Sequence, residues 1–333
     1  MTSVLILGAG RTGAAIAGAL LEHTVCRVWI AARDERRLEA VASALSTAFG
    51  VERLSARVLD AADRSVTAAL EPYDLVIVAA TIHEELPAIA RAAIAARTGY
   101  VDLWYSPQVS AQVLALGDSA AAAGVRLLTQ AGLQPGLPAI LARAVASHLE
   151  PPQRIVVASC GRTDWHRGPE RRAETFTEPV RPLAYHDGEW RNAAPTTVGF
   201  PQPFGRCLAG PMFLGELESL PERYPSLERL GFFVQDGFFD SVPAPHFALM
   251  RAEATNAHAR AAVNVLDRDG YELTARCVAS LVRQLAARPR EGQNGAFISG
   301  LWADPATFLA DLESMGATVW RDGVPSPTPE GGA

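Results

Sequence analysis

The sequence contains no lysine, so all 30 of its basic residues are arginine. Arginine stays protonated at any working pH, which excludes a lysine Schiff base and a lysine general acid. Cysteine is also scarce, and the four cysteines lie far apart without a C-x-x-C pair. This spacing argues against a metal site and a disulfide framework, and it predicts a reducing compartment, the cytoplasm.

Long apolar runs and an excess of positive charge are missing as well. No apolar run reaches the roughly 20 residues that a membrane helix needs. The apolar amino-terminal segment has no basic region before it and is interrupted by Arg11 and Gly13, unlike a signal peptide. The net charge of −6 argues against nucleic acid and membranes as partners. The expected partner is therefore a small-molecule substrate.

The 333 residues are enough for two domains. Residues 1–130 alternate between short β-type runs and longer helical stretches, which predicts an α/β domain with a doubly wound parallel sheet, the Rossmann fold. Residues 131–322 predict an α+β substrate domain with a mixed or antiparallel sheet, enough apolar surface for a homodimer, and a last helix that could pack back on the first domain. Residues 323–333, rich in proline and glycine, are expected to form a disordered tail.

Three local expectations concern helices and loops. Residues 106–123 predict a single helix that ends at Gly124. Residues 195–212 contain four prolines among phenylalanines and glycines, and they predict a long structured loop. A strand is expected at 173–177, and the other expected strands lie at 4–7, 27–31, 54–59, 74–79, 100–103, 125–128, 155–159, 248–254 and 261–266.

The most informative motif follows the first expected strand. Residues 4–13 run from an apolar segment into Gly8, Gly10 and Gly13, and a helical stretch follows. In such a G-x-G-x-x-G turn, Gly8 makes the tight turn, Gly10 lets the backbone approach a pyrophosphate, and Gly13 allows close packing of helix and strand. The N–H groups of the helix start, near Arg11 and Thr12, favour negative charge. The motif predicts a bound dinucleotide, with an ordinary βα turn as the alternative.

The end of the second expected strand indicates which dinucleotide is bound. An Asp or Glu about 20 residues after the glycines would bind the ribose 2′-hydroxyl of NAD. This chain instead has Arg33, with Arg36 and Arg37 close behind. A guanidinium suits a 2′-phosphate, so NADP(H) is favoured over NAD(H), with Arg33 as a plain surface charge as the alternative. Asp34 is explained by an N-cap of the following helix.

Further cofactor-binding candidates follow from the rule that ligands bind outside the carboxyl ends of the strands. Asp60 follows the third strand, where it could reach the adenine or serve as a turn residue. Ala80 and Thr81 follow the fourth strand, where the ribose next to the nicotinamide should pass. Small side chains there would let the backbone approach the cofactor.

Several segments, in their order and spacing, resemble the saccharopine dehydrogenase-like (saccharopine reductase) family. The resemblance covers residues 1–140 well and the second domain in patches. It implies a Rossmann domain, a substrate domain with a mixed sheet, and hydride transfer to or from a C–N bond, typically an imine formed from an amine and an aldehyde or 2-oxo acid. The segments that carry it are 8–13, 73–80, 99–103 and 131–137, with 187–190 and 200–205 similar to bacterial members.

Two departures limit what the family implies. Many members have Asp where this chain has Gln134, so a possible partner of a substrate ammonium group is neutral here. The lysine-forming members use a lysine–histidine pair, which a chain without lysine cannot form. We therefore expect an NAD(P)H-dependent oxidoreductase that reduces the imine of an amino-acid- or amine-derived substrate. The alternatives are a reductase of an activated C=C or C=O bond and a non-catalytic NADP(H)-binding sensor.

Imine reduction needs a proton at nitrogen or an iminium substrate, so a catalytic acid should lie near the ends of the fourth and fifth strands. His83, Asp102 and Tyr105 are the catalytic candidates there. Histidine can donate a proton near neutral pH, although His83 could also be a surface residue at a helix start. Asp102 ends its strand and could point into the cleft or cap the helix that begins near Ser106.

The substrate-binding candidates come from the second domain. Gln134 precedes a helix whose first turn is expected near Pro135, and that helix start could hold a substrate carboxylate or help to close the cleft. Several arginines could bind a carboxylate, and Arg162 is preferred because it directly follows an expected strand. The other arginines considered are Arg167, Arg171, Arg172 and Arg206.

Overall fold

The computed structural model describes residues 2–50, 52–60, 66–165, 180–240, 242–287 and 294–322. Within these residues, the first sheet holds seven parallel strands. This confirms the doubly wound parallel sheet. In spatial order the strands are β15 (Gly295–Ile298), β6 (Arg126–Thr129), β5 (Gly99–Asp102), β4 (Leu75–Val78), β1 (Ser3–Leu7), β2 (Arg27–Ala32) and β3 (Leu54–Val58).

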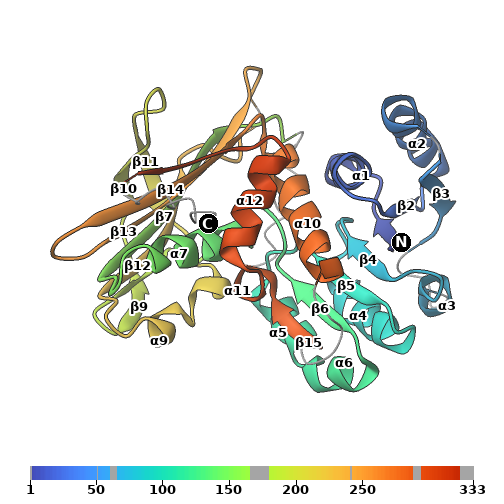
Figure 1. Cartoon of the computed structure of the whole chain (residues 1–333), viewed down its shortest axis with the longest axis horizontal. Helices are drawn as coiled ribbons and strands as arrows, with labels where there is room; N and C mark the ends of the chain where they lie inside the picture. The colour runs from blue at the N-terminus through green and yellow to red at the C-terminus, as the bar shows by residue number, and fades with distance from the viewer. Residues whose placement is uncertain are drawn as a thin grey trace, which may run out of the picture.

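Helices cover both faces of this sheet (Figure 1). The inner strands β1 and β4 are apolar runs that are almost completely inaccessible to solvent, as expected for parallel strands buried on both sides. The edge strand β3 is mostly exposed. The helices are α1 (Arg11–His23), α2 (Glu35–Phe49), α3 (Val66–Leu70), the 3-10 helix η1 (His83–Glu85), α4 (Leu86–Ala95), α5 (Pro107–Leu114), α6 (Gly117–Ala123) and α10 (Gly270–Ala287).

The second sheet is mixed, as expected, because β7 and β12 pair in parallel and the other pairs are antiparallel. Its strands are β7 (Arg154–Arg162), β8 (Leu183–His186), β9 (Glu189–Asn192), β10 (Thr196–Gly199), β11 (Arg206–Pro211), β12 (Arg229–Gln235), β13 (Phe247–Thr255), β14 (Arg260–Asp267) and β16 (Thr318–Asp322). Its helices are α7 (Leu137–Ser147), η2 (Gly215–Leu217), α9 (Leu220–Arg223), α11 (Ser299–Trp302) and α12 (Pro305–Ser314).

Two local expectations are wrong. The single helix over 106–123 is divided into α5 and α6, which are separated by Ala115 and Leu116. A Cβ on Gly117, the first residue of α6, would lie 3.7 Å from the Ala296 nitrogen in β15. The loop expected at 195–212 contains a hairpin of β10 and β11, whose prolines lie at strand ends and in the turn, where they cost no ladder hydrogen bond. The strand expected at 173–177 lies outside the described residues.

The two sheets share one hydrophobic core. The largest cluster of buried side chains runs from β1 and α1 through α10 and α7 to β7 and β13. Helix α10 lies beside α1, and β15 adds to the first sheet although it falls within residues 131–322. The carboxyl-terminal part of the chain therefore returns to the first sheet and fixes the two domains to one another.

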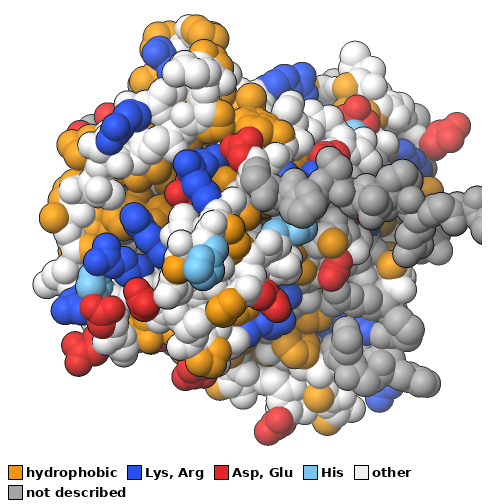
Figure 2. All heavy atoms as spheres, turned by 60° about the vertical axis from the view of Figure 1, so that its left-hand side comes forward, with side chains coloured by type: hydrophobic (Ala, Val, Ile, Leu, Met, Phe, Trp, Pro, Cys, Tyr) orange, Lys and Arg blue, Asp and Glu red, His pale blue; other side chains and the backbone are white. Residues whose placement is uncertain are grey.

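The face of the second sheet opposite α7 carries a smaller apolar cluster around Leu249 and Phe247. Figure 2 shows apolar side chains interspersed with basic ones on this side of the molecule. No helix in the described part of the chain is long and apolar enough to span a membrane.

Candidate active site

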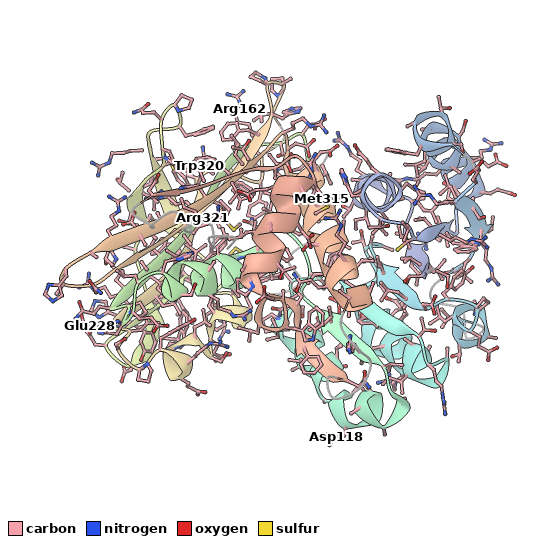
Figure 3. All side chains as sticks on the ribbon, viewed as in Figure 1. Asp118, Arg162, Glu228, Met315, Trp320 and Arg321 are labelled. Atoms are coloured by element: carbon pink, nitrogen blue, oxygen red, sulfur yellow. The ribbon has the colours of Figure 1, made fainter. Side chains whose placement is uncertain are left out.

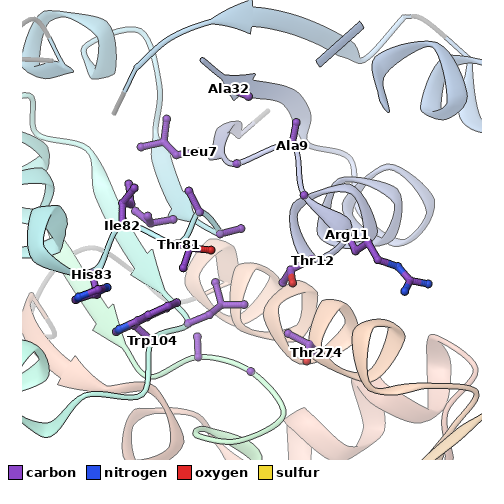
Figure 4. Close-up of a pocket in the computed structure, with 18 of the residues that line it drawn as sticks. Leu7, Ala9, Arg11, Thr12, Ala32, Thr81, Ile82, His83, Trp104 and Thr274 are labelled. Atoms are coloured by element: carbon purple, nitrogen blue, oxygen red, sulfur yellow. The ribbon is translucent and has the colours of Figure 1, made fainter. Parts of the chain in front are cut away.

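A cleft of about 970 Å³ opens at the carboxyl ends of β1, β4 and β5 (Figure 4). Strands β1 and β4 are neighbours although β2 and β3 lie between them in the chain, and ligands bind at such a switch point in doubly wound sheets. The loop after β6 and parts of the second domain complete the wall. Of the residues predicted from the sequence, the cleft is lined by Gly8, Gly10, Arg11, Thr12, Arg33, Asp60, Ala80, Thr81, His83, Tyr105 and Gln134.

The glycine turn has the geometry that a dinucleotide needs. Gly8 has φ +124° and lies so close to the end of β4 that a Cβ there would come 2.8 Å from the nitrogen of Ala80. A Cβ on Gly13 would lie 1.8 Å from the Gly8 oxygen, so this glycine allows helix and strand to pack. A Cβ on Gly10 would meet only the Arg37 side chain, at 3.8 Å. The cleft side of Gly10 is therefore open to a close approach by a phosphate.

Helix α1 begins directly at this turn. Gly10 is its N-cap and offers no side-chain acceptor, so the first N–H groups of the helix have no capping side chain. Thr12 lines the cleft, whereas the Arg11 side chain points away from Thr81 and His83 (Figure 4). Its Nη1 donates to the Asp164 carbonyl at 2.5 Å and lies 3.4 Å from the Asp164 carboxylate. Arg11 thus links the phosphate-binding turn to the second domain.

Two arginine side chains line the cleft near the end of β2. Arg33 and Arg37 are exposed cleft residues, whereas Arg36 is not part of the lining. The Asp34 carboxylate accepts a hydrogen bond from the Arg37 backbone nitrogen at 3.1 Å and caps α2. Since Asp34 is engaged as a cap, the described residues offer a 2′-phosphate two guanidinium groups at this end, with Asp60 nearby in the lining.

A pair of aromatic rings lines the cleft after the ends of β4 and β5. The imidazole of His83 stacks on the indole of Trp104, with ring centroids 5.5 Å apart and an interplanar angle of 5° (Figure 4). His83 begins η1 after β4, and Trp104 follows β5. Within the described part of the chain, neither His83 Nδ1 nor Trp104 Nε1 has a hydrogen-bond partner, although both atoms are buried. Both can therefore serve a bound ligand.

The expectation that Asp102 points into the cleft is wrong. Its side chain is fully buried and does not line the cleft. One carboxylate oxygen accepts hydrogen bonds from the Trp104 backbone nitrogen at 3.0 Å and from the Thr129 hydroxyl at 3.1 Å. Burial raises the pKa of Asp102 to about 6. Asp102 therefore holds the backbone that carries Trp104 and does not face the cleft.

Tyr105 and Gln134 both line the cleft, but their polar atoms differ in availability. The Tyr105 hydroxyl donates to the Phe213 carbonyl at 2.7 Å, which ties this loop to the second domain. Both polar atoms of the Gln134 amide are buried and have no partner among the described residues. The Gln134 amide is thus available to a ligand as a donor and an acceptor, whereas the Tyr105 hydroxyl is engaged.

The start of α7 is already engaged by a side chain of the protein, which argues against one of the alternatives considered above, a substrate carboxylate at this position. The buried carboxylate of Glu216 already occupies this position and accepts a hydrogen bond from the Gly136 nitrogen at 2.8 Å. Burial raises the pKa of Glu216 to about 8. The first turn also begins later than expected, because Pro138 rather than Pro135 lies in it.

Of the arginines considered as carboxylate ligands, the two that the structure describes do not line the cleft. Arg162 ends β7 on the second domain, is exposed and does not line the cleft (Figure 3). Arg206 is exposed on β11 and does not line it either. Arg167, Arg171 and Arg172 lie outside the described residues.

Sequence reasoning missed the contribution of the second domain to the cleft. Trp165, Phe239, Tyr271 and Thr274 line it from three separate segments. Nothing in their local sequence connects them, because the sheet and α10 bring them together only in the fold. Arg37 was noted beside Arg33 in the sequence but was not singled out as a cofactor ligand; it lies in the first turn of α2, whereas Arg33 precedes that helix.

Residues 4–128 match the family described as the saccharopine dehydrogenase NADP binding domain. This match covers little more than a third of the chain and confirms, over these residues, the resemblance inferred from the sequence. No curated protein matches the chain by sequence.

Solved structures share the fold over nearly the whole chain. Saccharopine dehydrogenase (L-Glu forming) from Saccharomyces cerevisiae has a TM-score of 0.69 at 13% identity, covering 97% of this chain and 100% of that one. DAP dehydrogenase from C. glutamicum in complex with DAP has a TM-score of 0.52 at 15% identity, covering 94% and 98%. An engineered D-amino acid dehydrogenase bound to NADP+ has 0.51 at 15%, also covering 94% and 98%. The chain therefore has an NADP-binding, dehydrogenase-like oxidoreductase fold.

Proposed function

We propose that this chain is an NADP(H)-dependent oxidoreductase that reduces the imine C=N bond of an amine-derived substrate. One observation carries the proposal: the cleft beside the glycine turn also contains His83, Trp104 and Gln134, which hold buried polar atoms without partners among the described residues. Buried polar groups without partners are costly. Such groups beside the expected nicotinamide position favour an enzyme over a non-catalytic sensor.

The protein's part in this reaction is positioning and proton management. When bound, the nicotinamide supplies the hydride. His83 is our candidate for the group that delivers a proton to the substrate nitrogen, because its Nδ1 is buried, without a partner among the described residues, and held by the stacked Trp104. Gln134 would orient the substrate through its amide. An iminium substrate would need no added proton, and His83 would then act only as a polar neighbour.

The preference for NADP(H) over NAD(H) is part of the same proposal. Arg33 and Arg37 line the end of the cleft where the second strand stops, and Asp34 is engaged in capping α2. A ribose 2′-phosphate between two guanidinium groups would gain charge-assisted hydrogen bonds that a 2′-hydroxyl lacks.

The test is oxidation of NADPH, followed by its absorbance, with an amine and a carbonyl compound together, with the carbonyl alone, and with an activated alkene. We expect turnover only with the amine–carbonyl mixture. Turnover with the carbonyl alone or the alkene would instead support reduction of C=O or C=C on this scaffold. Binding of NADPH without turnover in any mixture would support the sensor.

Variants test the role of His83 in the same assay. We expect His83→Asn to lower turnover by about 100-fold, the range for loss of a general acid, with little change in NADPH affinity. Tyr105→Phe is the matched comparison, because it removes a hydroxyl that is engaged by Phe213. An equal loss in both variants would contradict the assignment of His83.

A further inference from the structure

The second domain faces the cleft with aromatic rings. Trp165 follows β7, Phe239 follows β12 and Tyr271 lies in the first turn of α10, and all three line the cleft. The Trp165 ring lies 5.2 Å from that of Tyr271 and 6.3 Å from that of Phe239, measured between centroids. We call these three residues the aromatic wall.

The aromatic wall uses its polar atoms internally. The Trp165 indole nitrogen donates to the Phe238 carbonyl at 2.8 Å, and the Tyr271 hydroxyl donates to the Trp165 carbonyl at 2.9 Å. These bonds satisfy the side-chain donors of Trp165 and Tyr271, and Phe239 has none. The wall therefore offers a ligand ring faces and edges rather than hydrogen bonds.

The aromatic wall is held in place before any ligand binds. A Cβ on Gly270 would lie 2.3 Å from the Trp165 ring, so the glycine is what lets this ring pack against α10. The Arg11 guanidinium lies 4.9 Å from the centre of the Tyr271 ring while it bonds to Asp164. Since Arg11 begins α1 at the glycine turn, the wall is anchored directly to the dinucleotide-binding element.

Trp104, stacked on His83, and Gln134 line the same cleft from the first sheet and the loop after β6. The cleft thus has the available polar atoms of His83, Trp104 and Gln134 on one side and the aromatic wall on the other. Burying an apolar group against the wall is favourable in proportion to the area removed from water. A carboxylate against ring faces would lose its hydration and meet the negative side of each ring.

We propose that the substrate of this site carries an apolar, flat group, such as an aromatic ring, next to the carbon of its C=N bond, and that this group packs on the aromatic wall. The inference rests on the proposed function, because it specifies the substrate of that same site. A cationic iminium nitrogen would be favoured by the same rings through cation–π attraction.

The test measures binding of two stable secondary amines, N-benzylisopropylamine and N-isopropyl-β-alanine, to the full-length protein saturated with NADP+, by calorimetry. They differ in having a phenyl group or a carboxylate on the arm that would face the aromatic wall. We expect the benzyl compound to bind at least tenfold more tightly. Equal affinity, tighter binding of the carboxylate, or no binding of either would overturn the proposal.

Phe239→Arg should reverse this preference, because it replaces a ring of the aromatic wall with a carboxylate partner. Phe247→Arg is the matched control: Phe247 lies on the second sheet, its ring packs against that of Phe204 with centroids 4.8 Å apart, and it does not line the cleft. The control should bind both amines as the unaltered protein does. If Phe239→Arg changed NADP+ affinity alone, the wall would serve the cofactor and the proposal would be wrong.

The two proposals fail in different ways. Preferred binding of the benzyl amine without turnover of any amine–carbonyl mixture would contradict the proposed reaction and leave the aromatic wall's role intact. Turnover of imines with a preference for carboxylate-bearing partners would support the reaction and overturn the inference about the substrate.

Discussion

Replacing Arg33 with alanine should separate the affinities for NADPH and NADH. Arg33 is exposed at the end of β2 and lines the cleft. A 2′-phosphate carries a charge of about −1.5 to −2, and unit charges about 4 Å apart attract by about 1 kcal/mol in water. With a charge-assisted hydrogen bond, the loss should be about 1.5 kcal/mol, or about tenfold in the dissociation constant of NADPH. NADH lacks the phosphate and should bind as before.

The assay is a fluorescence titration of both reduced cofactors at low and at physiological ionic strength. Arg37→Ala should resemble Arg33→Ala, because both side chains line the cleft, and the effect of each should shrink as salt screens exposed charges. Arg36→Ala is the control, since Arg36 lies on the same stretch but not in the lining. The reasoning is refuted if Arg33→Ala still prefers NADPH by the original factor, or if Arg36→Ala matches it.

Three further predictions concern packing and buried acids. Gly13→Ala should lower the free energy of unfolding by about 3 kcal/mol in urea titrations, because the new Cβ would overlap the Gly8 oxygen, whereas Gly10→Ala should fold normally and lose dinucleotide affinity. Burial raises the pKa of Glu216 from 4.5 to about 8. The folded state therefore binds this proton more tightly than the unfolded state, so the free energy of unfolding should fall as pH rises from 4.5 to about 8. Glu216→Gln should remove this pH dependence. Asp102→Asn should remove a similar slope between pH 3.8 and about 6, and should cost far less turnover than the roughly 100-fold expected for a proton donor.

The part of the fold that depends on local signals could be predicted from the sequence. The inner strands β1 and β4 are short apolar runs, and the αL conformation of Gly124 ends α6 as its position predicts. Strand β15 could not be identified in this way, because its four residues form a strand only by pairing with β6, more than 160 positions earlier in the chain. Pairing partners that distant leave no periodic pattern in a single sequence.

The candidate site divides in the same manner. Gly8, Gly10 and Gly13 act through their own backbone, so the sequence was sufficient to predict them. Asp102 was misplaced because the end of a strand says where a residue lies but not which face it uses. Side chains alternate along a strand, but Tyr100, Val101 and Asp102 are all buried because helices cover both faces of the sheet. Neighbouring residues therefore gave no sign of whether Asp102 faces the cleft.

The return of the chain to the first sheet places α10 against α1 and so joins the two domains beside the cleft. Helix α10 lies along α1 and begins with Gly270 and Tyr271, which carry and support the aromatic wall. Arg11, the first residue of α1, donates a hydrogen bond to the carbonyl of Asp164, the residue before Trp165 of the aromatic wall. The Arg11–Asp164 bond and the packing of α10 on α1 therefore join the glycine turn directly to the aromatic wall, on the opposite side of the cleft.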